Sequence, residues 1–197
     1  QSGKILADLP AYSRIGTSSI RRRVQLLAKI PHLQIEDVHG NIDTRLKKVE
    51  TLEFDGLILA AAGLIRLGLK AKITEFLNLD TMIPAPSQGA LAVNVRSRDS
   101  TSLTLVSEID DPIARATTIA ERSFSRTLGG NCHVPVAAYA EVRNDTLFLQ
   151  GLIATSLGQK IINGTAQGSL SNPKRVGEHL AEKLLGQGGD EILAELS

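Results

Sequence analysis

The sequence has one cysteine, no tryptophan and only 3% aromatic residues among its 197 positions. A single cysteine excludes a disulfide within the chain, and the lack of aromatic residues leaves the core to Leu, Ile, Val and Ala. No charge dominates either, because 22 Lys and Arg face 21 Asp and Glu, a net charge of +1. The longest apolar run, GLILAAAGLI at residues 56–65, is too short to span a bilayer. We therefore expect neither nucleic acid nor a membrane as a partner.

The overall composition is that of an ordinary globular protein, with 42% hydrophobic and 22% charged residues. The chain opens with QSGKILADLP, which has no initiator methionine and no signal-peptide pattern. We expect it to be a piece of a longer protein.

The first half of the chain alternates short strands with helices, which predicts right-handed βαβ units around a parallel sheet. Ser18 is the expected N-cap of the first helix, and Asp43 opens the second. The stretch at 56–61 has no alternation, as in a strand buried on both faces. The expected strands are residues 14–17, 33–38 and 56–61, and the expected helices are residues 18–30 and 43–50. The first helix is expected to bury Ile20, Val24, Leu27 and Ala28.

The second half has a different pattern. TMIPAPSQG at 81–89 is typical of a hinge, ALAVNV at 90–95 of a strand, and SRDSTS at 97–102 of a polar loop. A helix with an acidic cap and Pro112 in its first turn follows, with an apolar stripe of Ile113, Ala116, Ala120, Phe124 and Leu128. The remaining elements are strands at 134–142, 147–154 and 160–166, a helix opened by Asn172 and Pro173, and a closing helix at 190–196. The fold class is therefore α/β: a parallel or mixed sheet domain, followed by a small α+β domain with a three-stranded antiparallel sheet.

The turn GTSSIRRR at residues 16–23 is typical of an anion site. A helix N-terminus offers unpaired N–H groups and the positive end of the helix dipole. Thr17, Ser18 and Ser19 add hydroxyl groups, and Arg21 and Arg22 add planar guanidinium groups suited to carboxylate or phosphate. The same residues also fit a serine-capped helix with a solvated basic face.

Two further cations follow strands of the predicted sheet. Arg45 lies near the start of the second helix, and Arg66 lies just beyond the strand at 56–61. Because the carboxyl ends of parallel strands meet in one crevice, these residues and Arg21 and Arg22 are candidates for one polyanionic ligand. Each of them alone also fits an ordinary surface arginine.

The single cysteine, Cys132, sits in the glycine-rich stretch GGNCHVPVAAYA at 129–140. No second cysteine or histidine cluster accompanies it, so we predict no metal site. His133 is its neighbour, but adjacent residues of an extended chain point to opposite faces, which disfavours a Cys–His catalytic pair. A reactive or permanently modified thiol remains.

At this point the motifs identify a family. The chain resembles porphobilinogen deaminase, also called hydroxymethylbilane synthase, through motifs that follow in order along nearly the whole length. They are GTSSIRR, GNIDTRL, FDGLILAAAGLIRLGL, PSQGALAV, ERSFSRTLGGNCHVPVAAYAEV and GLIAT.

The resemblance implies a transferase of tetrapyrrole and haem (porphyrin) biosynthesis. Such enzymes add four porphobilinogens head to tail, with loss of ammonia, to a dipyrromethane cofactor bound through a thioether, here to Cys132. The partners are then porphobilinogen and the growing polypyrrole chain. By resemblance, the cofactor and chain are held by Thr17, Ser18, Ser19, Arg21, Arg22 and Arg45. Arg66 and Gln88 would bind the incoming substrate.

The resemblance also implies a domain plan. Residues 1–83 match part of a second domain of the periplasmic-binding-protein-like (type II) kind, residues 84–109 a hinge and return segment, and residues 110–197 the C-terminal domain. Most of the first domain, which carries the family's catalytic aspartate, has no counterpart here, so no catalytic residue is nominated. We expect this chain to be inactive alone. The complete protein is expected to be a cytoplasmic monomer, or plastid-located in a plant or alga.

Two positions depart from the family pattern. His39 stands where arginine is common, which would weaken an anion contact or make it depend on pH. Asn131 stands before the cysteine, where a small residue is usual. A non-catalytic small-anion-binding module of the periplasmic-binding type is the alternative function, and it does not account for the cysteine loop. A cysteine-nucleophile enzyme is a third, which lacks a plausible base.

Overall fold

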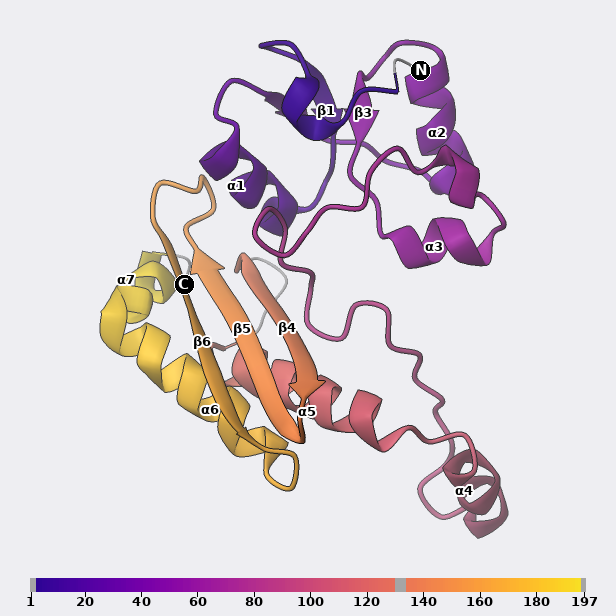
Figure 1. Cartoon of the computed structure of the whole chain (residues 1–197), viewed down its shortest axis with the longest axis vertical. Coiled ribbons are helices and arrows are strands. Elements are labelled where there is room, and N and C mark those ends of the chain that lie inside the picture. The colour runs from indigo at the N-terminus through magenta and orange to yellow at the C-terminus, as the bar shows by residue number, and fades with distance from the viewer. Residues whose placement is uncertain (1–2, 130–133, 196–197) are drawn as a thin grey trace.

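A computed structural model describes residues 3–129 and 134–195 of the chain. Figure 1 shows two sheets, each accompanied by its own helices, with the segment that contains α4 extending away from both. The fold is thus mixed α/β, with a parallel sheet first and a separate antiparallel sheet after it.

The parallel sheet has the order β2-β1-β3, with β1 (Arg14–Gly16) in the middle, β2 (Gln34–Glu36) on one side and β3 (Gly56–Leu57) on the other. Its helical elements are η1 (Leu6–Asp8), α1 (Ile20–Lys29), α2 (Ile42–Glu50), α3 (Ala61–Arg66) and η2 (Lys70–Lys72). The predicted alternation of strand and helix is confirmed. Close packing requires glycine at the end of β1, since a Cβ on Gly16 would lie 2.6 Å from the Leu57 side chain.

The expected strand at 56–61 is wrong in length and burial. Only Gly56 and Leu57 pair with β1, both are half-buried, and α3 already begins at Ala61. These residues are less covered than expected because they line an open cavity, described below.

The starts of two helices differ from the predictions by one residue. Ser19, not Ser18, caps α1, because its side chain accepts a hydrogen bond from the Arg22 backbone N–H. Helix α2 begins at Ile42 rather than at Asp43, and Asn41 caps it, with its side chain accepting from the Thr44 N–H. In both cases the cap is the residue whose extended backbone aims its oxygen at the first helical turn.

The buried face of α1 differs from the expected one. Val24 is fully buried, but Ala28 is exposed and Leu27 only half-buried. Arg21 and Gln25 are buried in their place, because this face of the helix packs against Ile83 as well as the sheet. Residues 81–89, which include Ile83, keep the name hinge below after their sequence pattern.

Leu52 is strained at the end of α2. It adopts the left-handed conformation (φ 60°) with 81% of its surface exposed, where the Glu53 N–H donates back to the Lys48 carbonyl at 2.8 Å. This is the position at which helices favour glycine. Leu52→Gly should therefore raise the free energy of unfolding by about 0.5–1 kcal/mol, measured by chemical denaturation.

A matched control for this prediction is Leu67→Gly. Leu67 follows α3, is 56% exposed and has an ordinary φ of −84°. It should give no gain, and an equal gain in both variants would show that strain at Leu52 is not the cause.

The segment between the two sheets contradicts two predictions. Residues 90–95 form no strand: they have no pairing partner among the described residues, and Leu91 is 88% exposed. The polar stretch expected as a loop contributes to α4 (Ser100–Ser107), which begins because the Asp99 carboxylate accepts the Ser102 N–H at 3.0 Å.

The C-terminal half confirms the predicted meander. β4 (Val136–Arg143), β5 (Thr146–Ala154) and β6 (Ile161–Ser169) are antiparallel in the order β4-β5-β6. The helical elements are α5 (Pro112–Thr127), α6 (Pro173–Leu184), η3 (Leu185–Gly189) and α7 (Asp190–Glu195). The predicted acidic cap of α5 is Asp111, and the predicted Pro173 opens α6.

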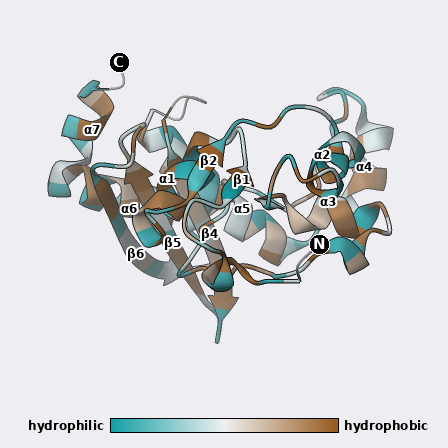
Figure 2. Ribbon diagram, turned by 90° about the horizontal axis from the view of Figure 1, so that it is seen from above, coloured by the Kyte–Doolittle hydropathy of each residue, from teal (hydrophilic) through white to brown (hydrophobic). Residues whose placement is uncertain are grey.

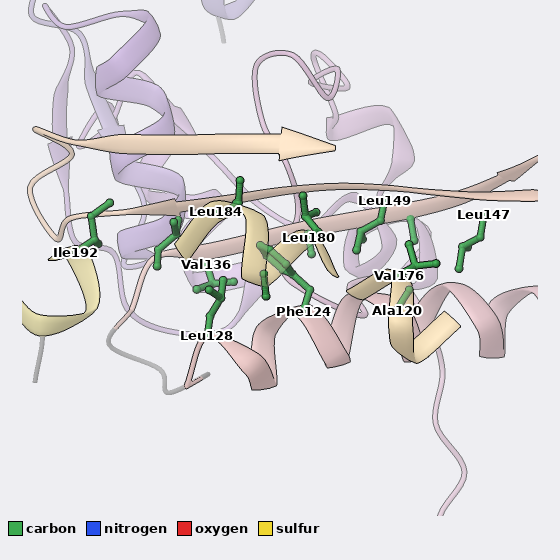
Figure 3. Packing of buried hydrophobic residues seen from close by; sticks show 14 residues of the cluster. Ala120, Phe124, Leu128, Val136, Leu147, Leu149, Val176, Leu180, Leu184 and Ile192 are labelled. Atoms are coloured by element: carbon green, nitrogen blue, oxygen red, sulfur yellow. The ribbon is translucent and has the colours of Figure 1, made fainter. Parts of the chain in front are cut away.

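Helices α5 and α6 pack on one face of this sheet. Figure 3 shows their apolar side chains meeting those of the strands, with Phe124 and Leu180 near the centre. Figure 2 shows hydrophobic residues running along β4 and β5. The predicted stripe of α5 is buried except for Ile113, which is 55% exposed at the helix start. Gly177 lets α6 approach α5 closely, because a Cβ there would overlap the Ala120 carbonyl oxygen.

A small apolar cluster joins the two halves. Its buried residues come from α1, the hinge, β4 and β5: Val24, Ile83, Ala137, Leu152 and Ala154. The Ala138 N–H also donates to the Pro84 carbonyl at 3.1 Å, so the hinge runs along the free edge of β4. Within the described ranges, no helix has both the length and the apolar character that crossing a membrane would need.

Candidate anion-binding site at the start of α1

The N-terminus of α1 lies at the carboxyl edge of the parallel sheet and contacts the segment that follows each strand. The Thr17 N–H donates to the backbone carbonyl of Glu36, at the end of β2, at 2.9 Å. The Ser18 hydroxyl donates to the carbonyl of Val38 at 2.7 Å, and Arg22 donates to the carbonyl of Ile58 at 2.8 Å. The crevice predicted from the strand order is therefore present at this edge.

The three hydroxyl groups shape this turn. The buried Thr17 accepts the Ser19 N–H at 3.3 Å, and Ser19 caps the helix. The Ser18 hydroxyl also accepts the Val38 N–H at 3.1 Å, so it ties the turn to the segment after β2. Their first effect is to fix the backbone from which the arginines project.

Arg21 is buried, with 9% of its surface exposed, so a solvated basic face is the wrong interpretation for this residue. Its guanidinium donates to the Ile83 carbonyl at 2.7 Å and approaches the Gln88 side-chain oxygen at 3.5 Å. Burial, together with a smaller contribution from repulsion by Arg22, lowers the pKa of Arg21 to about 10. The group still carries its charge at neutral pH, in a place where charge is disfavoured.

Arg22 is half-buried beside it. The pKa of Arg22 is also lowered, first by burial and then by repulsion from Arg45, so the three guanidinium groups are electrostatically coupled. Arg45 itself is held by a bond from its Nε to the Gly40 carbonyl at 2.8 Å. The site thus gathers positive charge from two helices.

Among the residues that the structure describes, neither Arg21, Arg22 nor Arg45 forms an ion pair with a carboxylate. Arg23, the next residue on the same helix, pairs with Asp37 at 2.7 Å. Buried charges are normally paired, so an unpaired buried guanidinium predicts an external anion.

A cavity of about 350 Å³ opens beside this charge. Arg21, Arg22 and Gln88 line one part of it, and Tyr139 of β4 also contributes. The rest of the lining combines apolar residues, from the segment around β3 and from Phe76, Leu77 and Leu79, with charged residues that include Asp55, Lys72 and Glu75. Such a cavity suits a ligand with apolar rings and acidic substituents.

The structure does not bring every predicted residue to this cavity. Arg66 is exposed at the end of α3 and is not part of the wall. Thr17, Ser18, Ser19 and Arg45 lie behind or beside the wall rather than in it. Cys132 lies outside the described residues, as do Asn131 and His133.

Two residues of this region were not found from the sequence. The buried Gln25 side chain accepts the N–H of Ile83 at 2.8 Å and donates to its carbonyl at 3.0 Å, so it holds the hinge that Arg21 contacts. Glu121 of α5 binds the next turn of the hinge through the Ser87 N–H at 2.6 Å. For each of them, the only indication in the sequence was that a polar residue interrupts a helix face predicted to be buried. In the described part of the chain, His, Asp and Glu side chains form no group that could hold a metal ion.

Comparison with known proteins gives this geometry a context. Residues 1–104 match the family described as "Porphobilinogen deaminase, dipyromethane cofactor binding domain". The chain belongs to the porphobilinogen deaminase family. Residues 116–186 match the C-terminal domain of the same family, so both halves of the chain are accounted for. The resemblance on which the motifs were interpreted is thus confirmed.

Individual relatives agree with the family match. The chain is 44% identical over 191 residues to a porphobilinogen deaminase of Thiobacillus denitrificans, covering 97% of this chain and 62% of the relative. It is 47% identical over 194 residues to one of Roseiflexus castenholzii, covering 98% of this chain and 64% of the relative. A porphobilinogen deaminase of Brevibacillus brevis is 43% identical over 197 residues, which is 100% of this chain and 63% of the relative. The chain therefore spans about three-fifths of the length of these relatives. Matches in both halves do not favour a non-catalytic anion module.

Proposed function

We propose that this chain is the cofactor-holding and chain-holding part of a hydroxymethylbilane synthase. The enzyme would join four porphobilinogens head to tail, with release of ammonia, to give hydroxymethylbilane. The observation that carries the proposal is that two guanidinium groups line one cavity without an ion pair among the described residues, that of Arg21 buried and that of Arg22 half-buried. Porphobilinogen bears an acetate and a propionate, so every added unit brings carboxylates to this site.

The residues of the site fit a dipyrromethane. Guanidinium groups bind carboxylates through two parallel hydrogen bonds, and Arg21 and Arg22 each have donors beyond those used on the Ile83 and Ile58 carbonyls. The apolar wall around Leu57 and Leu77 can pack against pyrrole rings. When bound, the dipyrromethane would supply the primer to which the chain is added.

The chain's own residues would hold and orient this primer. Arg21, Arg22 and Arg45 would bind acidic side chains, and the Thr17–Ser19 turn would keep those arginines in place. Cys132 would form the thioether, and Gln88 and Arg66 would act on incoming substrate, with Arg66 from the rim.

The domain plan is part of the same proposal. Residues 1–83 would belong to a domain of the type II periplasmic-binding kind, residues 84–109 to a hinge and return segment, and residues 110–197 to a C-terminal domain. The parallel order β2-β1-β3 supports the first assignment. The carboxylate that stabilises positive charge as ammonia leaves would come from the family's first domain. We propose that the complete protein is monomeric and cytoplasmic.

The 197-residue chain should be inactive alone. Catalysis of this kind needs charge stabilisation in a closed site, and the cavity described here is partly open to solvent. Incubation with porphobilinogen should give no tetrapyrrole. Turnover at a rate like that of the Thiobacillus denitrificans relative would show that the catalytic machinery is misplaced in our account.

We expect synthase activity in a chimaera. The chimaera joins this chain to the part of the Thiobacillus denitrificans relative that has no counterpart in this chain. The chimaera should convert porphobilinogen to hydroxymethylbilane in many turnovers. A folded chimaera that binds porphobilinogen but forms no tetrapyrrole would contradict the proposed activity and favour a binding module.

A further inference from the structure

Glu121 is a buried carboxylate within α5, with 7% of its surface exposed. Its two oxygens each accept a backbone N–H, one from Ser87 at 2.6 Å and one from Ala140 at 2.7 Å. These two donors belong to different parts of the molecule, since Ser87 is in the hinge and Ala140 is in β4. One carboxylate therefore links three segments that are distant in the sequence.

The hinge end of this link is a strained turn. Ser87 has a positive φ of 66°, which a residue other than glycine adopts at a cost. Its hydroxyl has no hydrogen-bond partner among the described residues. Backbone bonds from the Gln88 N–H to the Ala85 carbonyl and from the Ala90 N–H to the Ser87 carbonyl close the turn, and the bond to Glu121 ties it to α5. The next residue is Gln88, whose side chain meets the Arg21 guanidinium at 3.5 Å.

The other end of the link concerns the cysteine. In the sequence, Cys132 lies between the end of α5 at Thr127 and the start of β4 at Val136. Through Ala140, Glu121 joins these two flanking elements directly. The same side chain thus fixes both the turn that contacts Arg21 and the elements between which the cysteine segment runs.

We propose that Glu121 is a positioning residue, which sets the Gln88–Arg21 contact at a fixed place relative to α5 and β4, the two elements that flank Cys132 in the sequence. The proposal rests on the proposed function, because it assigns the cofactor to Cys132 and its carboxylates to Arg21.

The choice of a carboxylate here supports a role beyond packing. Burial raises the pKa of Glu121, and the two backbone hydrogen bonds only partly oppose that shift. No cation pairs with Glu121 among the described residues. An apolar residue would fill this place in the helix without burying a charge. The two N–H groups are accepted on two different oxygens, which a carboxylate offers and glutamine or leucine does not.

The test compares three variants of the chimaera. Glu121→Gln turns one acceptor into a donor, so one of the two N–H groups loses its partner. Phe124→Leu, on the same helix, removes volume from the C-terminal core and serves as the control for lost stability. Glu121→Gln with Ser87→Gly relaxes the strained turn, because glycine adopts a positive φ freely. Each is measured for unfolding midpoint, kcat and KM with porphobilinogen.

Glu121→Gln should lower kcat by about 10- to 100-fold, since a misplaced reacting group costs that much, with a smaller change in KM. Phe124→Leu should leave kcat within about twofold even where its unfolding midpoint falls further. Adding Ser87→Gly should recover part of the lost kcat, which a purely structural role in α5 would not allow. If kcat follows the unfolding midpoint equally in all three variants, Glu121 is structural and the inference is wrong. An inactive unmutated chimaera would instead contradict the proposed function.

Discussion

Replacing Cys132 with serine should abolish cofactor attachment, and with it the activity of the chimaera. Cys132 is the only cysteine of the chain, so no other thiol in it can replace it. A serine hydroxyl is a far poorer nucleophile than a thiol near neutral pH, because almost none of it is ionised. Hydroxymethylbilane formation should fall below detection, and the protein should keep its unmodified mass after incubation with porphobilinogen.

The control for this result is Arg23→Leu in the same chimaera. Arg23 lies on α1 beside the anion site, but its charge is already paired with Asp37. That variant should load cofactor and turn over normally. A Cys132→Ser chimaera that makes hydroxymethylbilane at the unmutated rate would overturn the assignment of the thioether.

Arg21→Leu should reduce ligand binding much more than stability. The substitution removes a charge-assisted contact to a bound carboxylate, worth about 1.5–3 kcal/mol, and should weaken affinity roughly 10- to 100-fold. Arg22→Leu should act in the same direction. Titration calorimetry measures this loss: a dipyrromethane with acetate and propionate side chains is titrated into the 197-residue chain and into each variant.

The stability of Arg21→Leu without ligand tests whether Arg21 holds an anion or the fold. The folded-state pKa of Arg21 lies below its ordinary value, so the folded chain holds this proton less tightly than the unfolded chain does. The charged guanidinium therefore lowers stability at pH 7, and this penalty fades as pH rises through about 10. Gln25 still donates to the Ile83 carbonyl when Arg21 is lost. Arg21→Leu should thus leave the unliganded unfolding midpoint unchanged or raised.

Arg23→Leu again provides the matched comparison, since it removes a paired arginine from the same helix. It should leave ligand affinity within about twofold, as exposed ion pairs contribute little. A large loss of unliganded stability in Arg21→Leu would mean that this arginine holds the fold rather than an anion.

The sequence predicted the β1–α1 turn because its determinants are local. A strand, a run of hydroxyl residues and the arginines lie within ten positions, so spacing alone places Arg21 and Arg22 at the sheet edge. What the sequence did not show is that Arg21 turns inward. That depends on the carbonyl of Ile83, 62 residues further along the chain.

The predictions that were wrong also concern contacts between residues distant in the sequence. The apolar stretch at 90–95 indicates a strand, but a strand needs a partner, and the described residues offer none. Glu121 and Gln25 are polar residues on buried helix faces, and a sequence pattern can say only that they interrupt an apolar stripe. Their function follows from backbone groups 34 and 58 residues away, which only the folded chain brings to them.

The intact mass of the chimaera after incubation with porphobilinogen tests the central claim most directly. Loading of Cys132 should add the mass of two porphobilinogens less two ammonias, in the unmutated protein and not in Cys132→Ser. The adduct should survive denaturation, because a thioether is covalent. A folded chimaera that forms hydroxymethylbilane while its mass stays unmodified would contradict the account.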